Sequence, residues 1–155
     1  MRTIDGVRRS GVGVDGSRTI REAAAIMEEA GVGCLAVLDG EHLVGVVTDR
    51  DLVRRALARG LPPDARVDTV MTIPVVTVDA DADLHDAFVL FRTHAVRRLA
   101  VVRDDRFLGI VSVDDLLVDV AGDLADLARP LDVERRAPQH DSGVPATQVT
   151  TVSRA

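Results

Sequence analysis

Two phrases of the chain, GVVTDRD at residues 45–51 and GIVSVDD at residues 109–115, place a hydroxyl residue three positions before an aspartate. Each phrase closes an apolar run, so the pair stands where a strand ends and a helix begins. Unpaired N–H groups at a helix start and the helix dipole favour an anion such as phosphate. A carboxylate suits the two hydroxyls of a ribose instead. The same spacing is also a variant of the capping box, so each pair could satisfy only its own backbone.

The two phrases belong to an internal duplication. A shift of 64 residues, the separation of Gly45 from Gly109, aligns residues 12–52 with residues 76–116 without a gap. A repeat of this kind marks a supersecondary unit that cannot bury its apolar face alone, so the copies must pack on each other. Two copies predict a pseudo-symmetric pair rather than a solenoid.

Each copy predicts the element order β-α-β-β-α. Strands are expected at residues 11–14, 34–38, 43–47, 75–78, 98–102 and 107–111, and helices at residues 19–30, 49–59, 83–94 and 114–127. The chain is therefore predicted to be an α/β (α+β) protein whose two units, residues 7–60 and 61–128, pack sheet to sheet. Residues 61–70 are rich in turn formers and are expected to be a linker. Residues 129–155 lose the apolar pattern and are expected to be a disordered tail.

Composition narrows the possible partners. The chain has 155 residues, 46 % hydrophobic content and a net charge of −6, so nucleic acid and anionic membranes are not expected partners. With three Phe and no Trp or Tyr, it offers little aromatic surface for stacking single-stranded bases. No apolar run approaches a membrane span and the N-terminus lacks a signal-like stretch, so a cytoplasmic protein is expected. Cys34 lies in an apolar run and is expected to be a buried, inert thiol.

The duplicated unit resembles a pair of cystathionine-β-synthase (CBS) domains, the arrangement called a Bateman module. The resemblance covers roughly residues 7–125 and is carried by GVVTDRDL, GIVSVDDL, VGCLAVLDGEHLVG, VRRLAVVRDDRFLG and VMTIPVVTV. It is nearest to small stand-alone bacterial proteins of stress or hypoxia responses. It implies a regulatory ligand, namely AMP, ADP, ATP or S-adenosylmethionine, bound in clefts between the domains, with no required cofactor. It also implies a homodimer of pairs and a regulated protein partner.

The resemblance also assigns candidate ligand-binding residues, with adenine between Val76 and Val96. The better site is expected to comprise Val76, Thr77, Val96, Arg97, Arg98, Ser112, Asp114 and Asp115. The second site is expected to comprise Val12, Val32, Gly33, Thr48, Arg50 and Asp51. The first unit is the poorer one because it has Gly13 where Thr77 aligns and lacks the arginine pair, although Arg50 can supply a cation. Arg97 and Arg98 could instead be a solvated strand edge.

The sequence gives little support to a calcium site, a zinc site or a catalytic site. DADAD at residues 79–83 resembles the start of a calcium loop, but Leu84 replaces the required glycine, so an acidic helix start explains it better. The four histidines have no spacing that suits zinc, and no catalytic signature is present, so neither a metal nor an enzyme is expected. Two readings remain: a nucleotide sensor, or a ligand-free CBS-pair assembly module whose exposed helices invite homodimerisation.

Overall fold

The computed structural model of the chain describes residues 2–136. Within these residues the chain divides into two compact units, residues 2–121 and residues 122–136. The first unit holds both sequence repeats and all six strands of the described part. It also holds the cavities described below.

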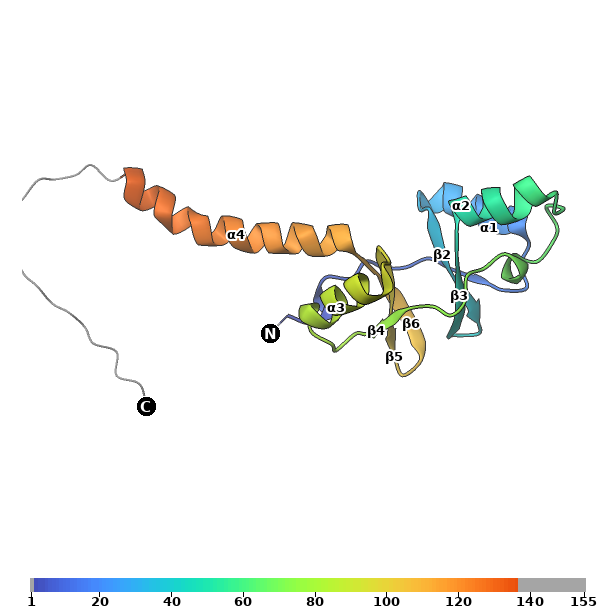
Figure 1. Ribbon diagram of the computed structural model, residues 1–155, viewed down its shortest axis with the longest axis horizontal. Coiled ribbons are helices and arrows are strands. Elements are labelled where there is room, and N and C mark those ends of the chain that lie inside the picture. Colours follow the sequence, from blue (N-terminus) through green and yellow to red (C-terminus); the bar gives the residue numbers. More distant parts are fainter. Residues whose placement is uncertain (1, 137–155) are drawn as a thin grey trace, which may run out of the picture. The chain divides into compact units, whose positions relative to one another are not determined.

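The first repeat forms a three-stranded sheet with helices beside it (Figure 1). Its elements are β1 (Gly13–Asp15), α1 (Ile20–Ala30), β2 (Cys34–Asp39), β3 (His42–Thr48), α2 (Asp49–Asp51), a π-helical turn η2 (Leu52–Ala56) and a 3-10 turn η3 (Leu57–Arg59). The start of α1 is fixed by a full capping box between Thr19 and Glu22. The helix predicted over residues 49–59 is helical along its whole length, but it changes from α-helical to π-helical after Asp51 and to 3-10 after Ala56.

The second repeat has the same order of elements. It comprises β4 (Thr77–Asp79), α3 (Leu84–His94), β5 (Arg98–Arg103), β6 (Arg106–Ser112) and α4 (Val113–Arg136). Strand registers repeat as well, because Val37 pairs with Gly45 in the first copy and Val101 with Gly109 in the second. The predicted α/β class and the duplicated β-α-β-β-α order are confirmed.

The two halves meet at the edges of their sheets. The strand order is β1-β2-β3-β6-β5-β4, and β3 joins β6 through the antiparallel pair His42 and Arg106. The contact between the two sheets that the structure records is this pairing of edge strands, which joins them into one six-stranded sheet. Each half keeps its own aliphatic core, one around Leu35, Val37 and Val47 and the other around Leu99 and Val101.

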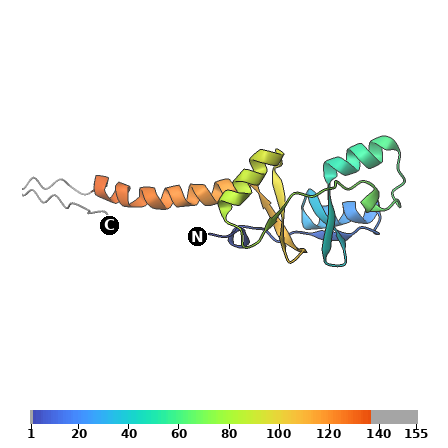
Figure 2. The same cartoon turned by 60° about the horizontal axis from the view of Figure 1, so that its bottom comes forward.

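The segment before the first repeat belongs structurally to the second. The 3-10 turn η1 (Ile4–Gly6) donates backbone hydrogen bonds from Ile4 to Ala82 and from Asp5 to Ala80, at 3.0 and 2.9 Å. Ile4 is fully buried in the second core. Figure 2 shows the N-terminal end of the chain beside the second repeat.

The segment that precedes the second repeat packs in turn on the first repeat. The 3-10 turn η4 (Val67–Thr69) places Val67 in the first core, and Val70 follows it there. Thr72 then pairs with Val46 of β3 through two backbone hydrogen bonds, at 2.7 and 3.2 Å. The stretch expected to be a linker therefore supplies core residues to the first repeat.

Helix α4 extends beyond the expected end of the second unit. Residues 129–136, expected in a disordered tail, are helical although Pro130 lies among them. A proline removes one amide donor and disturbs one turn, and the Leu, Glu and Arg residues around it are good helix formers. The rest of the expected tail, residues 137–155, lies outside the described residues.

Candidate functional site

Both hydroxyl–aspartate pairs cap the helices that they begin. The Thr48 amide donates to Oδ2 of Asp51 at 3.0 Å, and the Asp51 amide donates to Oγ1 of Thr48 at 3.1 Å. Ser112 and Asp115 make the same two bonds at 3.0 and 3.1 Å, and the Ser112 hydroxyl adds a third at 2.7 Å. The capping interpretation therefore holds at both positions. Any ligand must use the oxygen that capping leaves open.

The two aspartates differ in what their second oxygen contacts. Oδ1 of Asp115 accepts a hydrogen bond from Nε of Arg9 at 2.5 Å, and the Asp115 side chain is only 9 % exposed. Oδ1 of Asp51 lies 3.7 Å from Nε of Arg55, one helical turn further on. A carboxylate offers about four lone-pair positions. Asp115 uses three of them within the protein, which leaves about one for a ligand hydroxyl.

Asp115 is held in its charged form. Burial pushes the pKa of this carboxyl upward, but the hydrogen bonds from Ser112 and the bond and charge of Arg9 outweigh burial. The pKa of Asp115 therefore lies below its ordinary value of 3.8. At neutral pH this side chain is an ionised acceptor.

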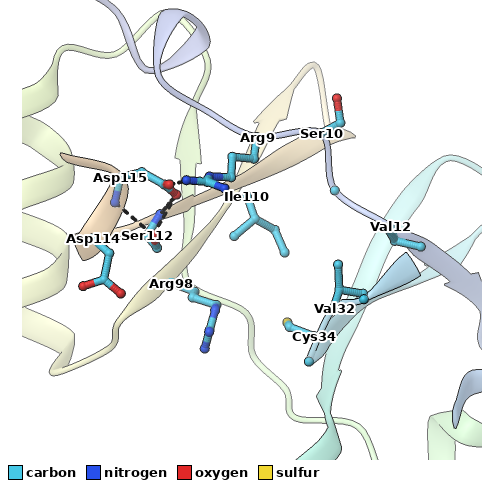
Figure 3. A pocket seen from close by; sticks show the side chains of 13 residues that line it. Arg9, Ser10, Val12, Val32, Cys34, Arg98, Ile110, Ser112, Asp114 and Asp115 are labelled. Carbon is cyan, nitrogen blue, oxygen red and sulfur yellow. Dashed lines mark hydrogen bonds and ion pairs between the residues drawn. The ribbon is translucent and has the colours of Figure 1, made fainter. Parts of the chain in front are cut away.

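A cavity of about 390 Å³ opens beside this carboxylate, between the two repeats. Its lining comprises Arg9, Ser10, Gly11, Val12, Gly31, Val32, Gly33, Cys34, Arg98, Ile110, Ser112, Asp114 and Asp115. Figure 3 shows Arg9 and Asp115 pointing toward one another on one side, with Val12, Val32 and Cys34 opposite. The first repeat thus supplies an apolar wall, and the second supplies carboxylates, a hydroxyl and Arg98.

This division of the lining suits a ligand with an apolar ring at one end and polar groups at the other. Val12, Val32 and Ile110 can cover the faces of a planar base, which gains from apolar contact. Arg98 is exposed and forms no ion pair with any residue that the structure describes. Its guanidinium is therefore a cation available to an anionic group.

The structure gathers residues of both expected sites into this one cavity. Val12, Val32 and Gly33, expected in the second site, line it together with Arg98, Ser112, Asp114 and Asp115 of the better site. This happens because the loops before β1 and β2 of the first repeat face the end of β6 in the second.

Other expected residues lie elsewhere. Thr77 lines a different hollow, of about 420 Å³, with His42, Leu43, Val44, Pro74, Val75, Val102 and Asp105. Val76 and Val96 pack against the second core. Arg97 pairs with Asp114 at 3.5 Å on an exposed surface. Thr48, Arg50 and Asp51 border neither of these two cavities.

Sequence reasoning missed several lining residues, of which Arg9 matters most. Arg9 precedes the duplicated stretch, and its contact with Asp115 exists only because residues 3–9 pack on the second repeat. Cys34 was expected to be buried; it is half-buried and lines the cavity, and burial raises the pKa of its thiol. Nothing in the local sequence around either residue signals a shared cavity.

The glycine of each phrase has a role in the fold. A Cβ on Gly109 would collide with the carbonyl oxygen of Arg9, and a Cβ on Gly45 would collide with the Met71 side chain. Close approach therefore requires glycine at both places, and the approaching group belongs to residues 3–9 at Gly109 and to residues 67–72 at Gly45.

The described residues give little support to metal binding or membrane insertion. Within residues 2–136 no group of three or more His, Cys, Asp or Glu side chains is arranged to hold a metal ion. Asp83 of the DADAD run caps α3 and accepts from the Asp86 amide at 3.0 Å. No helix in this part of the chain is both long and apolar enough to span a bilayer.

Comparison with known proteins agrees with the duplicated fold. The family model named CBS domain matches residues 7–58 and 67–122. The CBS domain-containing protein YhcV of Bacillus subtilis is 36 % identical over 106 residues, covering 68 % of this chain and 76 % of that protein. Hypoxic response protein 1 of Mycobacterium tuberculosis is 34 % identical over 119 residues, covering 75 % of this chain and 83 % of that protein.

Solved structures give the same answer. A crystal structure of hypoxic response protein I with two coordinated zinc ions superposes with a TM-score of 0.68 at 33 % identity, covering 75 % of this chain and 97 % of that one. CBS domain protein PAE2072 of Pyrobaculum aerophilum, complexed with AMP, superposes with a TM-score of 0.67 at 26 % identity, covering 78 % and 99 %. With two matched copies spanning most of its length, this chain belongs to the CBS domain family as a tandem pair.

Proposed function

We propose that the chain is a regulatory module that binds an adenosine nucleotide in the cavity between its two repeats. Occupancy would change the packing of the repeats or their association with a partner, and so carry a signal. The observation that supports this most directly is the cavity of about 390 Å³, in which an ionised carboxylate and cations face an apolar wall. The AMP complex of PAE2072 supports the same ligand class.

The lining residues have distinct roles in this proposal. The base lies against Val12, Val32 and Ile110, where its faces lose contact with water. A ribose hydroxyl donates to the remaining position on Oδ1 of Asp115. The anionic tail lies near Arg98. Regulation rather than catalysis is the general property of CBS-pair proteins, and the module needs no chemical step to act as a sensor.

Thermal unfolding with a ligand panel tests the proposal. AMP, ADP, ATP and S-adenosylmethionine are compared with GMP, which keeps the ribose phosphate but changes the base. A ligand at one hundred times its dissociation constant should stabilise the folded protein by about 2.7 kcal/mol. Absence of a shift with every adenosine compound would refute nucleotide binding.

A ligand-free assembly module is the second candidate, and an apolar groove favours it. The groove is lined by Ile20, Arg21, Ala24, Leu52, Val53, Ala56, Leu57, Leu61 and Pro63. Val53 and Leu57 are 55 % and 76 % exposed, so a partner surface that covered them would remove apolar area from water. We propose that a second copy covers it in a homodimer. Sedimentation of the wild type and of Leu57→Glu, with and without AMP, separates assembly from nucleotide binding.

A further inference from the structure

Arg9 reaches the cavity from the segment that precedes the aligned stretch, residues 12–52. Its backbone pairs with Ile110 of β6 in both directions, through N–H···O bonds of 2.9 and 3.0 Å. Its side chain then turns to Asp115 and donates from Nε to Oδ1 at 2.5 Å (Figure 3). The position of this side chain at the cavity is thus fixed by three hydrogen bonds.

The rest of the guanidinium is open. The Arg9 side chain is 78 % exposed, and neither terminal nitrogen donates to any residue within 2–136. Arginine carries five N–H donors in a fixed plane, so a bond through Nε leaves four donors for an acceptor in the cavity. An arginine already held at one nitrogen loses less side-chain entropy when it binds an anion.

The open hydrogen-bond donors around the cavity favour an anion. Asp115 is paired with Arg9, and Asp114 is paired with Arg97 at 3.5 Å. Arg98 lines the same cavity with no ion-pair partner in the described part of the chain. Asp49 lies close to Gly33 of the apolar wall, so the lining as a whole carries no excess charge. The open donors are concentrated instead at Arg9 and Arg98, and a phosphate group can accept from both.

The first repeat lacks an equivalent of Arg9. The exchanged segment that pairs with Val46 presents Thr72 at the corresponding place. The arginine beside Asp51 is Arg55, on the helix itself: its Nε lies 3.7 Å from Oδ1 of Asp51, and its Nη1 donates to the carbonyls of Val70 and Met71 and to the Thr72 hydroxyl. Of the two equivalent bridges, Arg9 with Ile110 and Thr72 with Val46, the first alone places a cation beside the capping aspartate.

From these contacts we infer that Arg9 is the residue that selects phosphorylated adenosine ligands over uncharged ones. This inference rests on the proposed function and specifies its ligand class. Asp115 holds Nε of Arg9 and accepts a sugar hydroxyl, while the terminal nitrogens of Arg9 donate to the phosphate. Because residues 3–9 are anchored on the second repeat, ligand binding also tightens the attachment of this segment.

Calorimetric titration with AMP and with adenosine tests the inference, using the wild type and Arg9→Gln. Loss of a charge-assisted contact should weaken AMP binding about 10- to 100-fold and change adenosine binding less than about 2-fold. Arg9→Lys, which keeps the charge but not the planar donors, should recover part of the preference. Arg106→Gln is the matched control, because Arg106 is an exposed arginine on the same β6 that pairs with Glu41 and does not line the cavity.

The outcomes separate the two proposals. An unchanged AMP-to-adenosine ratio in Arg9→Gln would overturn the role of Arg9 while nucleotide binding stands. An equal loss of both ligands would show that Arg9 acts only through Asp115, which also overturns it. A wild type that binds neither ligand would refute the proposed function and this inference with it. Circular dichroism melts establish that each variant is folded.

Discussion

Gly109→Ala tests whether the exchange of segments stabilises the fold. The new methyl group would occupy the space of the Arg9 carbonyl oxygen, which is backbone and cannot rotate away. The segment would have to shift, at the expense of two hydrogen bonds with Ile110 and the burial of Ile4. Each hydrogen bond contributes about 0.5 to 1.5 kcal/mol, and burying an isoleucine about 1.5 to 3 kcal/mol. Because the segment can relax in part, we expect a loss of about 3 kcal/mol.

Gly45→Ala is the matched control at the equivalent position. There the obstacle is the side chain of Met71, whose flexible thioether can adopt another rotamer. We expect this variant to lose about 1 kcal/mol or less. Urea unfolding followed by circular dichroism measures both, since the chain has no Trp or Tyr for fluorescence. Equal losses for the two variants would show that the packing of residues 3–9 contributes little.

Four further predictions concern single side chains. Asp115→Ala should weaken AMP binding more than Asp51→Ala in calorimetry, because only Asp115 lines the cavity; equal losses would contradict this assignment. The folded protein lowers the pKa of Asp115 below its ordinary value of 3.8. The charge of Asp115 therefore stabilises the fold above that value, and this contribution disappears as the pH falls through the folded pKa. The stability gap between wild type and Asp115→Asn should therefore be present at pH 6 and close toward pH 2, as pH-dependent melts can measure; a constant gap would argue against the ionised form. Gly122→Ala should raise the melting temperature and add about 1 kcal/mol, since this α4 glycine has open space around it; a fall would mean that the helix there is not formed. Cys34 should react slowly with iodoacetamide because its thiol pKa is raised, and more slowly with AMP bound, as mass spectrometry would record; a rate indifferent to AMP would place the ligand elsewhere.

Local patterns in the sequence were enough to predict the elements of each repeat. Apolar alternation and helical spacing are properties of short windows, and the capping boxes at Thr48 and Ser112 are local hydrogen-bond patterns. The class of fold and the order of elements followed from them. The end of α4 did not, because the apolar pattern stops before residue 129 although the helix continues to Arg136.

The candidate site was only partly predictable because it is assembled from distant segments. Ser112, Asp114, Asp115 and Arg98 were identified from the repeat and the family resemblance, and they do line the cavity. Val12 and Val32 were assigned to a second site, whereas the structure places both in the same cavity as Ser112 and Asp115. Arg9 could not be found this way, since its pairing with Ile110 joins chain segments that no local pattern connects.

The exchanged segments also bear on how such a chain can be divided. A break near residues 61–65 would leave Ile4 on the first fragment, although it packs in the core of the second repeat. Val67 and Val70 would be left on the second fragment, although they pack in the core of the first repeat. Neither fragment would hold a complete interior, yet the two together would contain every piece. The repeated stretch of sequence therefore does not coincide with the stretch of chain that forms one complete core. Each half needs a segment from the other half to complete its core.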